Sequence, residues 1–319
     1  MDKPADTTPL VSVIVLTYNQ EDSVGRTLDS ILAQKPGFAF EVVIGEDSST
    51  DSTRRVCERY AARYPGIIRL MPAAPRKGIT ANYYDCLRTC RGKYIADCSG
   101  DDRWPDEPRL AAHVALLEER PELSAVAGDW IENGAVREAT DRPGAADFIG
   151  ALAGLPVVLS AATFRADAVR GHIDSIVRED YPCEDLPLFM QLLESGPIAR
   201  HPRPALIYST ADGTVSRPRD IAKARTYHER VIAMRLSLIG RHSLDPACFT
   251  TPVSRRIDHL ARLTFRLGSG REALERLIEK YPYYRPSATS RLLLTLMRSR
   301  RAWNISRRLL QAVRPDRQC

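Results

Sequence analysis

The 319-residue sequence lacks long apolar runs, a leader-like beginning and the common nucleotide-binding loops. No stretch approaches the roughly 20 consecutive apolar residues that cross a bilayer. Residues 1–9 have neither the basic nor the apolar region of a secretory signal, so we expect a cytoplasmic protein. No Gly-x-Gly-x-x-Gly follows the first apolar run and no P-loop occurs, which argues against dinucleotide-dependent and ATP-driven reactions.

Cysteine is sparse and its spacing is irregular. The seven cysteines are an odd number scattered between Cys57 and Cys319, which argues against a disulfide framework and for a reducing compartment. Cys86, Cys90 and Cys98 lack the short paired spacing of a zinc site, so we interpret them as small buried apolar residues. The six histidines are also scattered, in no recognisable triad order, and we assign them no chemistry.

Positive charge is concentrated at the carboxyl end. The chain has a formal net charge of +6, but residues 291–319 contain eight arginines and one acid, Asp316. This segment therefore carries +7, and the rest of the chain carries −1. A nearly neutral body argues against a nucleic-acid partner, whereas a cationic end fits an anionic surface such as the inner leaflet of a membrane.

The basic tail has an amphipathic pattern. Its arginines are interleaved with Leu292, Leu293, Leu296, Trp303, Leu309 and Leu310. One interpretation is a peripheral helix that lies in an anionic membrane interface, which would suit a lipid-linked acceptor. The other is that the apolar face packs on the catalytic domain or on a second subunit, with the arginines solvated.

Apolar runs alternate with segments of helical period. The expected strands are residues 11–16, 40–44, 67–71, 94–98, 123–130 and 157–163, and the expected helices are residues 23–34, 53–64, 80–90, 105–119 and 185–194. Asp51 is the expected cap of the second helix. Strict rotation of strand and helix predicts βαβ units around a mostly parallel, doubly wound sheet. Residues 132–147 are expected to form a loop, and the chain beyond Pro218 is expected to be helical.

Two acidic clusters stand where predicted strands end. Asp47 follows the second strand, and Asp101 and Asp102 follow the fourth. The carboxyl ends of parallel strands form the rim where open α/β sheets bind ligands, so these carboxylates can meet one molecule from two sides. A nucleotide with a divalent metal fits that arrangement. Residues 48–53 are equally typical, taken alone, of turn and cap chemistry.

Residues 11–19, 46–53 and 92–104, in this order and at these intervals, resemble the motifs of family 2 glycosyltransferases. The likeness extends from about Leu10 to Ser216. It implies an inverting enzyme with the Rossmann-like GT-A fold. Such an enzyme uses a nucleotide-sugar donor, most commonly a UDP-sugar, and Mn²⁺ or Mg²⁺. We expect a catalytic domain over residues 1–218, with a nucleotide-binding half at about 10–104 and an acceptor half at about 105–218. A helical extension over 219–319, ending in the basic tail 291–319, would follow.

The resemblance also assigns roles to residues of the nucleotide side. It implies that Asp101 binds the metal and that Asp102 orients the sugar or nearby waters. Asp47 matches the position that binds the base or ribose, and Thr17 and Asn19 belong to the same wall. Gly78 and Asn82 match a stretch that lies close to the nucleotide, although a glycine before a helix is also typical of a plain turn.

The acidic pair Glu184 and Asp185 resembles the family motif that opens a helix beneath the acceptor. Inversion needs a carboxylate that takes the proton of the acceptor hydroxyl, and Asp185 is the candidate general base. The alternative is a first-turn acid that only stabilises its helix.

Two departures from the family pattern affect the expected chemistry. Ser99 stands where many relatives carry an acid; Asp97, on the same side of the strand, is a candidate to compensate. Residues 208–216 lack the cation and histidine of the family's Tyr-Arg-x-His-type segment, and Arg217, Arg219 and Arg103 are candidate replacements. We therefore keep two main functions: a glycosyltransferase of surface glycan or glycoconjugate assembly with a glycan or lipid-linked acceptor, and a catalytically impaired scaffold that binds nucleotide or glycan at the membrane. A nucleotidyltransferase is a third, weaker alternative.

Overall fold

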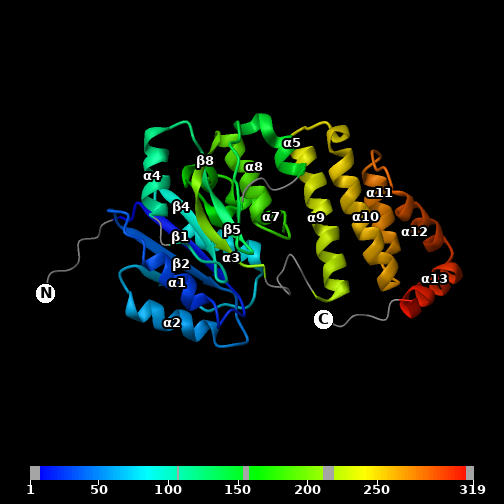
Figure 1. The fold of residues 1–319 in the computed structure, drawn as a ribbon, viewed down its shortest axis with the longest axis horizontal. Coiled ribbons are helices and arrows are strands. Elements are labelled where there is room, and N and C mark those ends of the chain that lie inside the picture. Colours follow the sequence, from blue (N-terminus) through cyan, green and yellow to red (C-terminus); the bar gives the residue numbers. More distant parts are fainter. Residues whose placement is uncertain (1–7, 106–107, 154–157, 211–218, 314–319) are drawn as a thin grey trace. The chain divides into compact units, whose positions relative to one another are not determined.

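The computed structural model describes residues 8–105, 108–153, 158–210 and 219–313 (Figure 1). These residues form two compact units. One unit holds residues 8–151 and 158–210, and the other holds residues 152–153 and 219–313.

An eight-stranded sheet forms the centre of the first unit. Its strands, in chain order, are β1 (Val11–Thr17), β2 (Phe40–Glu46), β3 (Ile68–Leu70), β4 (Tyr94–Ser99), β5 (Ala125–Glu132), β6 (Ala135–Arg137), β7 (Ala162–Arg165) and β8 (Ile198–Tyr208). They lie in the order β3-β2-β1-β4-β7-β5-β6, and β8 pairs with β5. The first four strands are mutually parallel, β7 runs antiparallel to β4 and β5, and β8 runs parallel to β5. The expected doubly wound, mostly parallel α/β sheet is thus confirmed.

Helices cover both faces of this sheet. They are α1 (Val24–Leu32), α2 (Thr53–Arg63), α3 (Ile79–Thr89), α4 (Arg109–Glu119), α6 (Asp167–Arg170), α7 (Ile173–Arg178) and α8 (Asp185–Ser195). A further helix, α5 (Phe148–Ala153), crosses the boundary between the two units. Val24, Leu28 and Ile31 recur at helical spacing, so α1 presents one apolar face, which joins Ile44 of β2 in the core. Gly45 faces the opposite side of β2, where a Cβ atom would lie 2.6 Å from Cys86 Sγ of α3. A residue without a side chain is therefore needed for α3 to approach the sheet.

Two expectations about the acceptor half are wrong in detail, and one strand was not expected at all. Residues 132–147 include β6, which forms a hairpin with β5 through Asn133 and Gly134, both at positive φ (51° and 77°). The expected strand at 157–163 is a 3₁₀ turn over Leu159–Ala161 followed by β7, and Val157 lies outside the described residues.

The third correction is β8, which the sequence pattern did not indicate. Pro202 and Pro204 interrupt it, and each lacks a backbone N–H for the ladder. The pairing with β5 accommodates them by shifting register on either side of Asp129. The two prolines break the alternation of apolar and polar residues by which a strand is recognised in a sequence, so this strand was not predicted.

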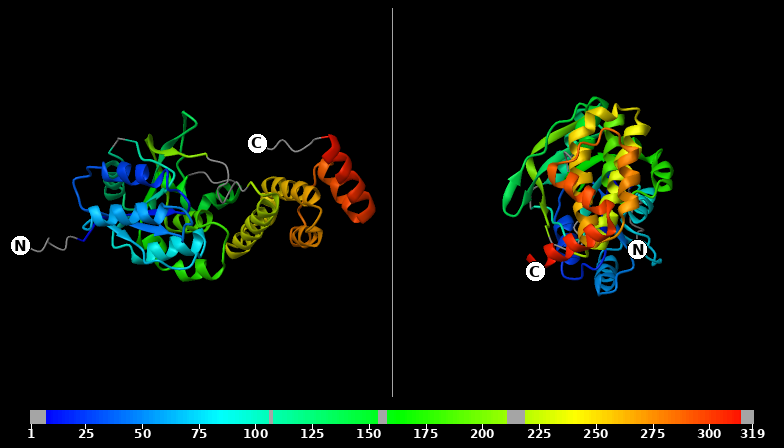
Figure 2. Two further views of the ribbon diagram at one scale, coloured as in Figure 1. Left: turned by 90° about the horizontal axis from the view of Figure 1, so that it is seen from below. Right: turned by 90° about the vertical axis from the view of Figure 1, so that its right-hand side faces the viewer.

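The second unit is helical, as expected for the chain beyond Pro218. Its helices are α9 (Ile221–Arg241), α10 (Thr250–Leu267), α11 (Arg271–Lys280), α12 (Ala288–Arg298) and α13 (Arg300–Val313), with a 3₁₀ turn at Pro246–Phe249. The carboxylate of Asp220 caps α9 and the hydroxyl of Ser287 caps α12. Figure 2 shows these helices, coloured yellow to red, packed against one another. Within the described residues, no helix is both long and apolar enough to span a bilayer.

The basic tail packs on its own unit at Trp303. This side chain is 8% exposed, its Nε1 donates to the carbonyl oxygen of Phe265 in α10 at 3.1 Å, and its ring lies near the Phe265 ring. Met297 is also buried. Leu292 and Ile305, in contrast, are 59% and 51% exposed. The apolar side chains of the tail are therefore divided between the interior of the helical unit and its surface.

Candidate functional site

The loop that follows β4 is fixed to β1 and α1. The amide of Gly100 donates to the Leu16 carbonyl at 2.8 Å, and the amide of Asp102 donates to the Ser99 carbonyl at 3.0 Å. The Thr27 hydroxyl lies 3.0 Å from the Gly100 carbonyl oxygen and 2.6 Å from that of Asp102. The loop is therefore held at both ends before any ligand binds.

Glycine is required at position 100. A Cβ atom there would lie 2.5 Å from Gln20 Oε1 and 2.7 Å from Thr17 Oγ1. The small residue lets the loop lie directly against the end of β1, and this brings Asp101 to the carboxyl edge of the sheet, where open α/β sheets bind their ligands.

Asp101 lines a cavity of about 290 Å³ at this edge. The other side chains that line it are Ser23, Arg26, Arg103, Ile207, Tyr208 and Ser209. Burial raises the pKa of Asp101 above its ordinary value, and a hydrogen bond from Gln20 opposes the shift. We refer to this space as the Asp101 cavity. One carboxylate, that of Asp101, and two arginines, Arg26 of α1 and Arg103 of the loop after β4, line this cavity.

The oxygen donors of the Asp101 cavity fit a hard divalent cation. Asp101 offers a carboxylate, and Ser23 and Ser209 offer hydroxyl oxygens. Among the described residues there is no group of three or more His, Cys, Asp or Glu side chains that could hold a metal alone. Mg²⁺ needs only one or two carboxylates when substrate phosphates and waters complete its shell, so Asp101 is sufficient as its protein ligand.

Asp102 is buried rather than open to the cavity. Its side chain is enclosed, and its Oδ1 accepts the amide of Ser209 at 2.8 Å, which ties the loop to the end of β8. Burial raises the pKa of Asp102 to about 7, the Ser209 amide opposes this, and the charge of Asp101 adds to it. The two neighbouring aspartates thus occupy different environments.

Asp47 organises the loop before α3. It is 6% exposed, and its two oxygens accept the amides of Lys77 at 2.9 Å and Gly78 at 3.0 Å. Gly78 has φ 84°, a conformation that favours glycine, and its missing side chain faces open space. The guanidinium of Arg76 lies 3.8 Å from the centre of the Tyr18 ring, a pair that the sequence interpretation did not include.

Three further predicted nucleotide residues support the rim. Asn19 Oδ1 accepts the amide of Thr50 at 2.8 Å, which joins the loop after β1 to the loop after β2. Thr17 is buried, and its carbonyl accepts the amide of Asp47 at 3.1 Å. Asn82 is also buried, and its Nδ2 donates to the Gly45 carbonyl at 2.8 Å.

The N-cap of α2 is Ser52, not the expected Asp51, and Ser52 makes no side-chain cap hydrogen bond. Asp51 lies one residue earlier, and its Oδ1 accepts the amide of Thr53, the first residue of the helix, at 2.9 Å. The segment 48–53 thus combines turn chemistry with a position on the rim.

Asp185 is the first residue of α8, as expected, and its Oδ1 accepts the amide of Leu186 at 2.7 Å. Beside it, burial and the charge of Asp185 raise the pKa of Glu184 to about 8. The Tyr84 hydroxyl donates to the Glu184 carbonyl at 3.2 Å, which fixes this end of the helix to α3.

Asp97 does not replace the acid missing at Ser99. Its side chain is 6% exposed, and its carboxylate accepts the Tyr83 hydroxyl, which lies 3.0 and 3.1 Å from its two oxygens. Burial raises the pKa of Asp97 to about 7, against the effect of the Tyr83 hydrogen bond. Because Asp97 is enclosed and does not line the Asp101 cavity, its geometry argues against metal binding.

One of the three candidate cations for a leaving group lies at the Asp101 cavity. Arg103 lines the Asp101 cavity, and its backbone forms two hydrogen bonds with Ile207 of β8. Arg219 belongs to the second unit, and Arg217 lies outside the described residues. Sequence reasoning missed Arg26; the available signal was its place in the first turn of the helix that follows the first strand.

Comparison with known proteins defines the class of this chain. The family model Glycosyl transferase family 2 matches residues 12–147. The putative glycosyltransferase EpsE of Bacillus subtilis is 32% identical over 194 residues, which cover 59% of this chain and 68% of EpsE. The chain therefore belongs to the family 2 glycosyltransferases.

Other relatives match over shorter segments. An uncharacterized protein of Mycobacterium tuberculosis is 41% identical over 114 residues, which are 36% of this chain and 33% of that protein. The match thus spans about a third of the length of this mycobacterial relative.

Two solved structures share the fold. Staphylococcus aureus TarS 1-349, in complex with UDP-GlcNAc, superposes with a TM-score of 0.62 at 17% identity and covers 93% of this chain and 88% of its own. The mannosyltransferase PcManGT of Pyrobaculum calidifontis, with GDP-Man and Mn²⁺, gives a TM-score of 0.51 at 18% identity, with coverage of 96% and 90%. These likenesses confirm the GT-A fold expected from the sequence.

Proposed function

We propose that this chain transfers a sugar from a nucleotide sugar to an acceptor hydroxyl with inversion at the anomeric carbon. A UDP-sugar is the proposed donor, and surface glycan or glycoconjugate assembly is the proposed setting. The Asp101 cavity carries this proposal, because one accessible carboxylate and two arginines line the same space at the carboxyl edge of the sheet.

The arginines of the Asp101 cavity suit a diphosphate leaving group. Negative charge gathers on the nucleoside diphosphate as its bond to the sugar breaks, and Arg26 and Arg103 offer fixed positive charge there. In many members of the family a cation from the segment that matches residues 208–216 approaches the diphosphate. Arg26 and Arg103 replace that cation in this proposal. A divalent cation such as Mn²⁺ or Mg²⁺, when bound at Asp101, supplies further charge neutralisation.

The nucleoside is assigned to the other end of the rim. Asp47 acts there by holding the 76–78 loop, and the stacked pair Tyr18 and Arg76 offers a flat surface for a base. Thr17, Asn19 and Asn82 keep this wall in place, and Asp102 holds the loop that carries Asp101.

Asp185 is the proposed general base. A carboxylate at the start of α8 removes the proton of the acceptor hydroxyl as that oxygen attacks the anomeric carbon. Burial first, and then the charge of Asp185, raise the pKa of the neighbouring Glu184, which favours the protonated form of that carboxyl over one that can act as a base.

The names and ligands of the relatives support a glycosyltransferase that uses a nucleotide sugar. EpsE is named as a putative glycosyltransferase, TarS was crystallised with UDP-GlcNAc, and PcManGT with GDP-Man and Mn²⁺. A non-catalytic scaffold is not favoured, because Arg26 and Arg103 provide the cations whose loss from residues 208–216 suggested it.

A donor screen followed by three variants tests the proposal. Nucleotide sugars are first ranked by the thermal shift that they cause with and without Mn²⁺, since a ligand of the native state raises apparent stability. Nucleoside diphosphate release is then measured for the wild type, Asp101→Asn, Arg103→Gln and Asp185→Asn. Asp174→Asn, an exposed acid on α7, is the control.

Each variant has its own expected signature. Asp101→Asn loses the response to Mn²⁺, and Arg103→Gln raises KM for the donor. Asp185→Asn keeps donor binding but lowers kcat by about 100-fold or more, the usual worth of a general base. Donor binding without release of nucleoside diphosphate, for every donor and acceptor tested, would instead favour the scaffold.

We extend the proposal to where the reaction takes place. A cytoplasmic reaction on a glycan or lipid-linked acceptor fits the exposed Leu292 and Ile305, which lie among the arginines of α12 and α13 and suit contact with an anionic leaflet. Sedimentation with anionic but not zwitterionic vesicles, weakened in Ile305→Asp, is the expected result. Concentration-dependent self-association without vesicle binding would assign the same surface to a homo-oligomer.

A further inference from the structure

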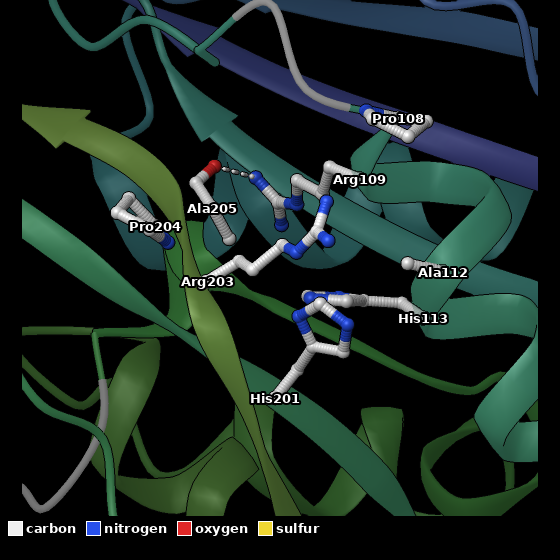
Figure 3. A pocket seen from close by; sticks show the side chains of 8 residues that line it. All are labelled: Pro108, Arg109, Ala112, His113, His201, Arg203, Pro204 and Ala205. Carbon is white, nitrogen blue, oxygen red and sulfur yellow. Dashed lines mark hydrogen bonds between the residues drawn. The ribbon is translucent and has the colours of Figure 1, made fainter.

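A second cavity, of about 300 Å³, lies between α4 and β8 (Figure 3). Arg109 and His113 line it from α4, and His201 and Arg203 line it from β8. We call it the histidine–arginine cavity. It shares no lining residue with the Asp101 cavity, and no carboxylate lines it.

Arg109 brings a buried positive charge to this cavity. Its side chain is 3% exposed, and its guanidinium donates to the carbonyl oxygens of Ser160 and Ala162 at 2.7 Å and of Ala205 at 3.1 Å. Its face lies 4.2 Å from the Trp104 ring. Burial lowers the pKa of Arg109 to about 10, so the group remains charged at neutral pH. Within the described residues its hydrogen bonds go to carbonyls, not to a carboxylate.

His113 brings a buried nitrogen that no protein group satisfies. The side chain is fully buried, and its Nδ1 lies 3.1 Å from Thr163 Oγ1 of β7. In the described part of the chain its Nε2 has no hydrogen-bond partner. Buried polar atoms are normally paired, so this nitrogen is open to a partner that the protein itself does not supply, either a water or a ligand atom.

His201 completes the paired imidazoles. The rings of His113 and His201 lie edge to face with their centres 5.4 Å apart. Figure 3 shows the two rings together on one side of the cavity and the guanidinium groups of Arg109 and Arg203 directed toward the same space. Arg109 and His113 of α4 and His201 and Arg203 of β8 therefore bring nitrogen donors to the same cavity.

We propose that the histidine–arginine cavity binds a phosphate group. A phosphate carries several acceptor oxygens in different directions, and guanidinium forks and imidazole N–H groups are the donors that match it. The cavity volume is large enough for a phosphate that is free or esterified to a small alcohol. This inference does not depend on the proposed sugar transfer, because the site is separate from the Asp101 cavity.

Titration calorimetry of the full chain with inorganic phosphate tests this assignment. The variants are Arg203→Gln and His201→Gln, which change side chains at the outer part of the cavity and leave the core residues Arg109 and His113 intact. Arg55→Gln, at an exposed position of α2 outside both cavities, is the matched control, and Arg103→Gln reports any phosphate that binds in the Asp101 cavity instead. Circular dichroism checks that each variant is folded. Glycerol 3-phosphate replaces inorganic phosphate in a second series, which separates an esterified phosphate from a free one.

Saturable binding to the wild type is expected, with the loss of one charge-assisted hydrogen bond in Arg203→Gln or His201→Gln weakening it by about tenfold. Arg55→Gln should leave this binding unchanged. The imidazole NMR signals of His113 should shift on phosphate addition in the wild type and not in Arg203→Gln. No saturable binding of either probe, or binding that disappears in Arg103→Gln and persists in Arg203→Gln, would overturn the proposal.

Discussion

The buried carboxyl of Asp97 should make the first unit less stable as the pH rises. Among the described residues, Asp97 receives its hydrogen bonding from one group, the Tyr83 hydroxyl, in a fully enclosed position. Burial raises its pKa from an ordinary 3.8 to about 7. Asp97→Asn keeps an acceptor for Tyr83 and removes the group that can ionise, so the two chains differ mainly in that charge.

The size of the effect follows from proton linkage. Because the folded pKa lies above the unfolded one, the folded state holds the proton more tightly, and the stabilisation present at low pH is lost as the pH rises through about 7. Between pH 5 and pH 8 the two pKa values correspond to a loss of about 2.5 kcal/mol. The free energy of unfolding of Asp97→Asn, relative to wild type, should therefore grow by that amount over the same interval.

Urea unfolding at pH 5, 6, 7 and 8 measures this difference. Tryptophan fluorescence reports on the first unit when both chains also carry Trp303→Phe, because only Trp104 and Trp130 then remain, and circular dichroism reports on the whole chain. Asp29→Asn is the matched control, because Asp29 accepts the Tyr60 hydroxyl at 2.7 Å but is exposed. A difference between wild type and Asp97→Asn that stays flat within about 0.5 kcal/mol, the usual error of additivity, would refute the reasoning.

Three further substitutions test the packing around the site and in the second unit. Gly100→Ala should cost about 1–3 kcal/mol by overpacking, while Gly66→Ala, which meets open space, should be near neutral in the same urea titration. Thr27→Val should lower stability by about 1 kcal/mol through loss of its hydroxyl, and Thr27→Ser should restore it. Trp303→Ala should lower the thermal midpoint of the helical unit, at a cost of about 3–5 kcal/mol, whereas Ile305→Ala should not; equal midpoints would contradict the packing of α13 on α10.

Local patterns were sufficient to predict the first half of the fold. Val11 to Leu16 and Phe40 to Ile44 are apolar runs bounded by turn residues, and strands of this kind are recognised without knowledge of their neighbours. The strand β8 was missed because its stability comes from pairing with β5 around two prolines, which is a property of two distant segments. The short β6 was missed because a three-residue strand carries too little periodicity.

The candidate site shows the same division. Asp47, Asp101 and Asp185 were proposed from the sequence because each stands at the end of a predicted strand or the start of a predicted helix and matches a motif of the family. Arg26 and Arg103 were not selected, since an arginine near a strand end is common and only the tertiary structure shows which ones line the same cavity as Asp101. His113 and His201 had no local signal at all, because their meeting depends on the position of β8.

The rim aspartates that the resemblance groups together divide into one that is open and two that are engaged. Both carboxylate oxygens of Asp47 accept backbone amides of the 76–78 loop, and Asp102 Oδ1 accepts the amide of Ser209. Asp101 alone among these three lines the cavity beside Arg26 and Arg103. A carboxylate oxygen that already accepts a backbone amide has fewer lone pairs for a ligand, so we propose that Asp47 and Asp102 act mainly by fixing the walls of the site. On that proposal the motif would serve with Ser99 in place of an acid, because Asp101 would hold Mg²⁺ or Mn²⁺ and such a cation needs only one or two protein carboxylates.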